Sequence, residues 1–265
     1  MSQPVDVTSV RTLDELVQVV RQLFLETRSR WWFRGHTDTT WELLPKVRRG
    51  YDVQTERYLT NLFYQRAKLR HANFPHDDDY AGWLALMQHY GLPTRLLDWS
   101  ESALVAAYFA TKYDRDMSTW KGDREAAIWM LQPETLNNGQ GYGRVFPSLN
   151  AGSLSRLVQE AFKNAPASEI SAKTYDVIAA VPVNHDLRMV MQQGAFTIHA
   201  SDVALDARPD CRPWLRKIVI PGESVPQMGA SLDVLGIRLS DVFPDLSHLA
   251  IDLMRMHRPT VAARS

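Results

Sequence analysis

The stretch MQHYGLPTRLLDWSES, residues 87–102, decides how the chain is organised, because it joins two expected helices through a short polar connection. The helix before it covers DDDYAGWLALMQHYG, residues 77–91, with three aspartates at its positive N-terminal end and Gly91 at its C-cap. Pro93 stops that helix, so LPTRLLDW is predicted as a connection. A buried, alanine-rich helix is then expected over SESALVAAYFATKY, residues 100–113.

Hydrophobic periodicity predicts further helices and strands, interspersed without strict alternation. Helices are expected at residues 12–26, 55–71, 153–162, 224–236 and 240–254. Strands are expected at residues 30–35, 40–45, 126–132, 175–183, 195–200 and 214–221, and residues 133–150 are expected to form a loop. The pattern predicts one α+β domain with small mixed or antiparallel sheets surrounded by helices, preceded by a helical segment within residues 1–29.

Composition indicates a soluble globular protein of 265 residues, with 45% hydrophobic and 23% charged residues. Lys plus Arg equals Asp plus Glu at 30 each, so net charge gives no attraction to nucleic acid or anionic membrane, although a local basic patch leaves nucleic acid open. Cys211 is the only cysteine, which favours a reducing compartment. Without a signal peptide or a long apolar span, we expect a cytoplasmic location and no membrane contact.

A first polar cluster, WWFRGH, brings Arg34, Gly35 and His36 to the end of an expected strand. Arginine carries a permanent charge and binds carboxylate or phosphate through a rigid fork. An arginine half-buried beside aromatic residues needs a partner. Two interpretations stay open: an anion or cofactor anchor, and a structural ion pair, for example with Asp98.

The second cluster is the opening stretch itself, whose turn can present side chains and backbone N–H groups to a ligand. His89, in the last turn of its helix, is either a general acid/base or a C-terminal cap. Asp98 is interpreted as a base, as a partner for an arginine or for His89, or as a cap. Ser100 or Ser102 could cap the following helix, and no G-x-S-x-G pattern marks Ser100 as a nucleophile.

A third cluster, MQQGAFTIH, places Gln192, Gln193 and Gly194 before a strand that ends at His199. Glutamines before a glycine turn either contact a substrate amide or ribose or make turn hydrogen bonds. No metal site is expected, because the eight histidines are scattered and the sequence lacks H-x-x-x-H and H-E-x-x-H.

Four segments, in this order, resemble one family: WFRGHTDTTWELLPKVRR (32–49), LALMQHYGLPTRLLDWSESALVAAYFA (84–110), QQGAFTIH (192–199) and LGIRLSDVFPDLSHLA (235–250). They look like the FRG domain family, named for the Phe-Arg-Gly that stands here at residues 33–35. The resemblance covers residues 30–250 and leaves residues 251–265 as a C-terminal tail. It implies an effector associated with bacterial defence or toxin systems.

A second resemblance implies a mechanism. ADP-ribosyltransferases begin their site with an arginine-glycine at a strand end, which Arg34-Gly35 matches. A strand with Ser-Thr-Ser then leads into a helix of pattern A-x-x-F-A. DWSESALVAAYFA (98–110) is similar, and places Asp98 or Ser100 at the motif serine. The third motif of that family carries a glutamate, where this sequence offers only QQGAF (192–196).

This second resemblance implies an ADP-ribosyltransferase-like fold with NAD as substrate. The catalytic residues would be Arg34, Asp98, Ser100 and Gln193, and the cofactor contacts would be Gly35, His36, Gln88, His89, Arg95 and Phe196. Gln193 would lie near the anomeric carbon and orient an acceptor macromolecule that the sequence does not identify. Two alternatives stay open: a non-catalytic nucleotide- or protein-binding module, and a nuclease or hydrolase that uses His89 and Asp98.

Overall fold

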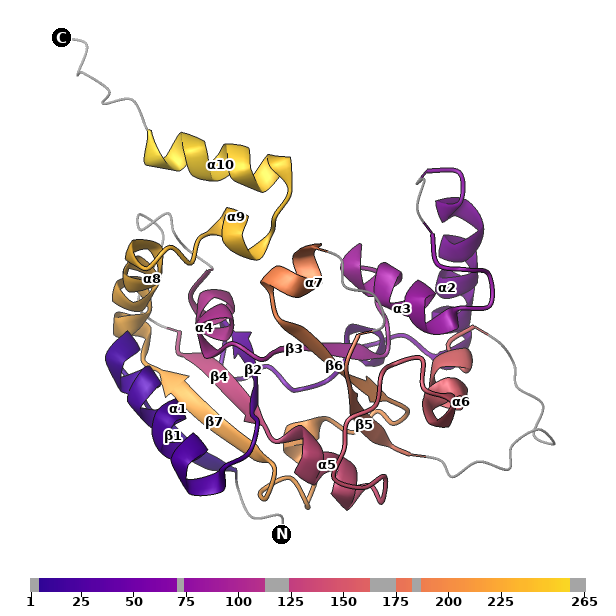
Figure 1. The fold of residues 1–265 in the computed structure, drawn as a ribbon, viewed down its shortest axis with the longest axis horizontal. Helices are drawn as coiled ribbons and strands as arrows, with labels where there is room; N and C mark the ends of the chain where they lie inside the picture. The colour runs from indigo at the N-terminus through magenta and orange to yellow at the C-terminus, as the bar shows by residue number, and fades with distance from the viewer. Residues whose placement is uncertain (1–4, 71–73, 113–123, 163–174, 183–186, 258–265) are drawn as a thin grey trace.

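The α+β prediction is confirmed by a computed structural model, which describes residues 5–70, 74–112, 124–162, 175–182 and 187–257. Within these residues, seven strands join one mixed sheet in the order β1-β7-β4-β2-β3-β6-β5 (Figure 1). The strands are β1 (Asp6–Ser9), β2 (Trp32–His36), β3 (Leu96–Ser100), β4 (Ala126–Leu131), β5 (Val177–Ala180), β6 (Gly194–His199) and β7 (Leu215–Ile220). β1 and β7 run parallel, and the other neighbouring pairs are antiparallel.

Helices cover the sheet in separate groups. They are α1 (Leu13–Thr27), α2 (Val53–Ala67), α3 (Tyr80–His89), α4 (Ala103–Thr111), α5 (Pro133–Gly139), α6 (Ser155–Gln159), α7 (Leu187–Met191), α8 (Val225–Val234), α9 (Leu239–Val242) and α10 (Leu246–Met256). α1, α4 and α8 share one apolar cluster with β4 and β7, whereas α3 and α6 share another with β5 and β6. A third cluster includes α5 and side chains from β2, β3 and β4. α1 and α8 therefore lie on the opposite flank from α2 and α3 (Figure 1).

α3 ends as its sequence predicts, at a glycine in the left-handed region. Gly91 has a φ of 78°. Its N–H donates to the carbonyl of Gln88 (3.0 Å), and the N–H of Leu92 donates to the carbonyl of Met87 (3.0 Å). These two bonds form a Schellman motif, which satisfies carbonyls that the helix end would leave unpaired. After this turn the chain continues toward β3.

α4 begins at a side-chain cap and packs against bare backbone. Ser102, and not Ser100, is its N-cap, with the hydroxyl oxygen accepting from the N–H of Val105 at 3.3 Å. A Cβ placed on Gly35 of β2 would lie 2.0 Å from the carbonyl oxygen of Ala106 and 2.5 Å from the nitrogen of Ala110. Only glycine permits this approach. Gly35 thus fixes α4 against the end of β2.

β2 and β3 separate in the middle of the sheet. Their register pairs only Phe33 with Ser100, whereas β2 pairs with β4 along its whole length. Successive strand residues face opposite sides of a sheet. Phe33 accordingly packs in the cluster with α4, and Trp32 packs in the cluster with α5. Beyond Phe33 the strands open a gap, and this gap is where the candidate site forms.

The prediction that LPTRLLDW is a plain connection is wrong, because its residues 96–99 belong to β3, which lies beside the central strand β2. The strand is only five residues long, and its adjacent apolar residues Leu96 and Leu97, which are buried in different clusters, interrupt the short alternation of Leu97, Asp98, Trp99 and Ser100. The strand predicted at residues 40–45 is also wrong. These residues form a loop, in which Leu43 is buried and its N–H donates to the carboxylate of Asp206 at 2.9 Å.

Other differences have local causes. The loop expected at residues 133–150 contains α5, which starts with Pro133 at the first helical position, where proline is favoured. The helix expected at residues 240–254 is divided into α9 and α10 around Pro244, which cannot continue a helix. β1 and α7 had no strong pattern. All four residues of β1 are exposed, so no apolar alternation marks it.

Candidate functional site

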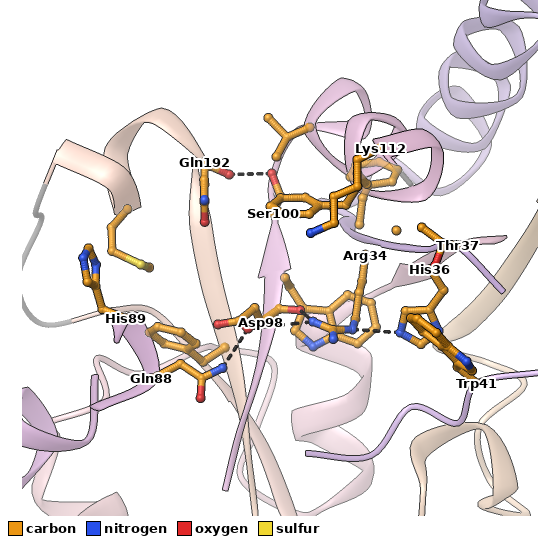
Figure 2. A pocket seen from close by; sticks show the side chains of 18 of the residues that line it. Arg34, His36, Thr37, Trp41, Gln88, His89, Asp98, Ser100, Lys112 and Gln192 are labelled. Atoms are coloured by element: carbon orange, nitrogen blue, oxygen red, sulfur yellow. Dashed lines mark hydrogen bonds and ion pairs between the residues drawn. The ribbon is translucent and has the colours of Figure 1, made fainter. Parts of the chain in front are cut away.

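A cavity of about 370 Å³ lies where β2 and β3 separate, between α3 and α4 (Figure 2). Its walls come from distant parts of the sequence: β2 and the following loop, α3, β3, α4, and the segment that leads from α7 into β6. Of the residues predicted from sequence, eight line it: Arg34, Gly35, His36, Gln88, His89, Asp98, Ser100 and Phe196. Segments far apart in the chain thus meet at one place.

Arg34 spans the gap between the two strands. Its Nη1 donates to the backbone carbonyl of Asp98 at 2.7 Å, and its Nε donates to Nε2 of His36 at 3.0 Å. The carboxylate of Asp98 lies 3.9 Å from Nη1, at the outer limit of an ion pair. Nη2 has no hydrogen bond within the described part of the chain. Arg34 is therefore held in one orientation with one edge of its guanidinium left for a ligand.

His36 is a neutral acceptor. Arginine Nε can only donate, so Nε2 of His36 must accept, and the ring proton sits on Nδ1. Burial, and after it the charges of Arg34 and Arg49, lower the pKa of His36 to about 3. The His36 ring also meets Trp41 edge to face, with centroids 5.9 Å apart. His36 thus orients Arg34 without adding charge to the cavity.

The carboxylate of Asp98 is oriented by a relay from α3. Nε2 of Gln88 donates to Oδ2 of Asp98 at 2.7 Å, and Oε1 of Gln88 accepts from the hydroxyl of Thr94 at 2.5 Å. Thr94 in turn accepts from the N–H of Leu96 at 3.1 Å. The side chain of Asp98 remains 53% exposed. It therefore offers a fixed acceptor at the cavity wall.

The cavity gathers positive charge and aromatic rings. Besides Arg34, it is lined by Arg49, whose Nε donates to the carbonyl of Leu44 at 2.9 Å, and by Lys112 at the end of α4. The ammonium of Lys112 lies 4.9 Å from the ring centroid of Phe109. Three cationic side chains thus face one carboxylate, that of Asp98, within the described lining. Such a site favours an anion that carries a flat ring.

Ser100 links the site to the far end of the sequence. Its hydroxyl donates to the backbone carbonyl of Gln192 at 2.6 Å and accepts from the N–H of Ser102 at 3.0 Å (Figure 2). The side-chain Nε2 of Gln192 donates to the carbonyl of Val242 at 3.0 Å. The Ser100 hydroxyl is thus engaged in positioning the turn before β6, and Gln192 ties that turn to α9.

Gln193 does not occupy its expected place. It lies in the left-handed region with a φ of 47°, its side chain is exposed, and it is absent from the cavity lining. Its backbone carbonyl accepts from the N–H of Glu101 at 2.9 Å. The turn that sends the chain into β6 rotates Gln193 away and leaves Gln192 at the wall. The prediction therefore needs a shift of one residue.

Arg95 also lies elsewhere, in the core. It is 1% exposed, and its Nε and Nη2 donate to the two carboxylate oxygens of Glu56 at 2.7 and 2.8 Å. Its Nη1 donates to the carbonyl of Leu157 at 2.8 Å. The expected cofactor contact is corrected to a structural clamp that joins α2, β3 and α6, because a buried arginine requires this full pairing.

Some lining residues were missed by sequence reasoning. Trp41 and Arg49 lie in the first family segment, where the sequence assigns them no role, and Lys112 lies two residues beyond Ala110, the end of the A-x-x-F-A pattern. Gln192 belongs to the third cluster, but the resemblance assigns the place near the anomeric carbon to Gln193. The one signal in the sequence for Trp41 and Arg49 was the presence of an aromatic residue and several basic residues within the short segment 41–49.

Other possible reactive features lie outside this cavity. Cys211 is buried, and burial raises the pKa of its thiol, which disfavours the reactive thiolate. Within the residues that the structure describes, no group of three His, Cys, Asp or Glu side chains could hold a metal ion. Among the described helices, none has the length and apolar character needed to cross a membrane.

Comparison with known proteins identifies one family. Residues 29–119 match the model of the FRG domain. No curated protein and no solved structure matches the chain. The match begins just before β2 and runs past α4, so it includes Arg34, Gln88 and Asp98 of the cavity wall. The segment of the chain that matches the FRG domain therefore has its Phe-Arg-Gly, residues 33–35, in the wall of the cavity.

Proposed function

We propose that the cavity binds NAD or a related nucleotide, and that the protein is an ADP-ribosyltransferase-like enzyme. One observation carries the proposal. The two segments that resemble ADP-ribosyltransferase motifs, and the QQGAF segment that stands in place of the third, lie on or directly before neighbouring strands, β2, β3 and β6, around a single cavity. Their separation in sequence, from residue 34 to residue 192, makes this convergence a stronger indication than any one motif.

The charge and shape of the cavity support a nucleotide. Arg34, Arg49 and Lys112 can contact the oxygens of a diphosphate, and arginine does so with a rigid fork. Trp41 and Phe109 provide flat apolar surface for a base or a nicotinamide ring. A volume of about 370 Å³ lies within the range of small-molecule sites. The cavity would enclose part of a dinucleotide and leave the rest at its mouth.

The carboxylate of Asp98 suits a ribose. Nucleotide-binding proteins use an Asp or Glu to accept hydrogen bonds from ribose hydroxyls. The relay through Gln88 holds Oδ2, which leaves Oδ1 for a hydroxyl. In the proposed complex, Arg34 would bind a phosphate and Asp98 the ribose of the same nucleotide.

The proposed reaction breaks the bond between the nicotinamide nitrogen and the ribose C1 atom. The bonding electrons go to the nicotinamide, the sugar passes through an oxocarbenium-like state, and a nucleophile on the acceptor bonds to C1 and loses its proton. The Asp98 carboxylate would stabilise the positive sugar, and the side-chain oxygen of Gln192 would orient the acceptor. An effector role in bacterial defence or toxin systems, together with the macromolecular acceptor that it implies, belongs to this proposal.

A non-catalytic nucleotide-binding module is the second candidate, favoured by a specific observation. Asp98 is the one carboxylate in the described lining of the cavity, and positions 192 and 193 of the turn before β6 are both glutamines. Binding needs the cations and rings, whereas transfer usually needs an acid near the acceptor.

The test is calorimetric titration of the purified protein with NAD, run beside an assay of nicotinamide release. Saturable binding with release of nicotinamide supports the enzyme. Binding without release supports the module. Two results together contradict both the enzyme and the binding module. The unmodified protein does not bind NAD, and Arg34→Lys and the unmodified protein also behave alike toward ADP and ADP-ribose.

A further inference from the structure

A second cavity, of about 510 Å³, lies between α2 and α3. These two helices lie on the flank away from α1 and α8 (Figure 1). Its floor and walls are apolar and half-buried: Leu59, Leu62, Phe63, Ala67, Leu86 and Leu92. Tyr90 stands at one side, with its ring 6.5 Å from that of Phe63. The cavity is separate from the nucleotide site, because Leu86 and Tyr90 face it while Gln88 and His89 of the same helical segment face the other cavity.

Two arginines border this apolar groove. Arg66 in the last turn of α2 and Arg70 in the turn that follows both line the cavity, and Nη1 of Arg70 donates to the backbone carbonyl of Arg66 at 2.8 Å. Among the described residues, neither pairs with a carboxylate, although the neighbouring Lys68 pairs with Asp77 at 2.5 Å. Like charges at this spacing repel each other. An anion placed between them would remove that repulsion.

The size of the groove decides the class of ligand. Nine of the described residues line it, whereas a protein partner of standard size contacts about 20–30 residues on each side. Its volume instead lies within the about 300–1,000 Å³ that is typical of small-molecule sites. An apolar groove that ends at two cations matches a small molecule with an apolar chain and an anionic head.

We propose that this groove binds a single-chain amphiphile with a carboxylate or phosphate head, taken up as a free monomer. The chain lies along the leucines and Phe63, and the head contacts the guanidinium groups of Arg66 and Arg70. Burial of the chain supplies the affinity, and the arginines supply the preference for an anion.

The probes are octanoate, decanoate and dodecanoate, with dodecyltrimethylammonium as a cation of matched chain length, all kept below micelle formation and titrated by calorimetry. Each buried methylene is expected to tighten binding about fourfold. Dodecanoate is expected to bind about tenfold tighter than the ammonium compound, because Arg66 and Arg70 attract its carboxylate and repel the ammonium group.

Variants then locate the site. Arg66→Glu and Arg70→Glu should each weaken dodecanoate binding by up to about fivefold and strengthen binding of the ammonium compound. Arg255→Glu on α10 changes net charge equally and should alter neither. Leu62→Gln should weaken both probes. Thermal unfolding of each variant, measured without ligand, separates lost binding from lost structure.

Three results would overturn the proposal. One is equal affinity for the anionic and cationic probes. Another is affinity that does not rise with chain length. The third is failure of monomers to bind while vesicles of an anionic phospholipid do bind, which would make the face a membrane contact. NAD titration of the same variants is unaffected by any of these outcomes, so the two sites are tested separately.

Discussion

Nη1 of Arg34 lies 2.7 Å from the backbone carbonyl of Asp98, and this hydrogen bond takes the place of strand pairing where β2 and β3 separate. The arginine therefore has two roles at once. It closes the gap in the sheet through Asp98 and His36, and it presents its remaining nitrogen to the cavity. The two interpretations left open by the sequence, an anchor and a structural partner, are compatible in this geometry.

Arg34→Lys should separate the two roles. Lysine keeps the charge but cannot reach both Asp98 and His36 with a fork, so we expect a loss of about 2 kcal/mol in unfolding free energy. NAD affinity should fall about tenfold or more, because the contact to phosphate loses its orientation. Urea unfolding and calorimetry measure the two effects. Arg49→Lys is the matched control, expected to weaken binding with less effect on stability. Unchanged NAD affinity in a destabilised Arg34→Lys protein would leave only the structural role.

Gly35→Ala should be among the most destabilising single changes in the domain. The new methyl would lie 2.0 Å from the carbonyl oxygen of Ala106, so α4 must move off the sheet, at a cost of about 3 kcal/mol or more. Gly91→Ala gives the comparison. Gly91 has a positive φ but open space around its Cβ position, so strain alone should cost about 1 kcal/mol. Equal losses in urea unfolding would refute the argument from close packing.

These elements also show what sequence could and could not predict. The end of α3 could be predicted because the Schellman motif there needs a residue with positive φ, and glycine adopts that conformation most easily. The start of α1 could be predicted as well, because threonine is a common N-cap residue, and Thr12 does accept from the N–H of Glu15 at 3.2 Å. β3 was hidden because it is short and because its first two residues, Leu96 and Leu97, are both apolar and buried in different clusters, which interrupts the alternation. β1 was hidden because an exposed edge strand is held by its pairing with β7 and not by burial.

The site was predictable to the extent that its residues stand in recognisable motifs. Arg34, Gln88 and Asp98 were found in this way and do line one cavity. Gln193 and Arg95 were misplaced for different reasons. A single left-handed residue turns Gln193 outward, and a one-residue change in direction leaves no mark in composition. The partner of Arg95 is Glu56, 39 positions earlier, a pairing that only the folded chain reveals.

Stability should decrease between pH 6.5 and 4.5 because of buried histidines. Burial lowers the pKa of His36 and of His199 to about 3, with neighbouring arginine charges adding to the shift. The pKa of each histidine in the unfolded state is near 6.5. As the pH falls through this window, the unfolded state therefore comes to hold almost two protons that the folded state does not bind. Well below pH 6.5, each histidine should therefore lower the unfolding free energy by about 1.4 kcal/mol per pH unit as the pH falls.

The measurement is urea unfolding at several pH values in this window. His36→Gln keeps an acceptor for Nε of Arg34 but cannot titrate, so its slope should be smaller by about 1.4 kcal/mol per pH unit. His76→Gln, at an exposed position beside Asp78, is the control and should not show that reduction. An unchanged slope in His36→Gln would mean that His36 is not held neutral.

Asp98→Asn should slow nicotinamide release with little loss of structure. The asparagine oxygen can still accept from Gln88, so the wall should keep its shape. In the proposed reaction the Asp98 carboxylate stabilises the positive sugar, and asparagine removes that charge, so release should fall about tenfold or more. Single-turnover rates at saturating NAD measure this change. An unchanged rate would place the Asp98 carboxylate away from the ribose C1 atom.

The catalytic prediction concerns the turn before β6. Gln192 lines the cavity and is fixed by its bond to the carbonyl of Val242, so its side-chain oxygen can act near C1 of the ribose. A group that orients the acceptor acts on the transition state and not on the bound nucleotide. Gln192→Ala should therefore lower nicotinamide release about tenfold or more while leaving NAD affinity within about twofold.

Gln193→Asn is the matched control for this change. Asparagine tolerates the left-handed backbone of this position, and the side chain lies outside the cavity, so release and affinity should both stay near those of the unmodified protein. Rates from single-turnover measurements at saturating NAD, compared with calorimetric affinities, distinguish the two steps. If Gln193→Asn lowers release and Gln192→Ala does not, the one-residue shift in the site is wrong. If Gln192→Ala lowers affinity as much as rate, the glutamine contributes to binding of the nucleotide itself, and the chemistry must depend on Asp98.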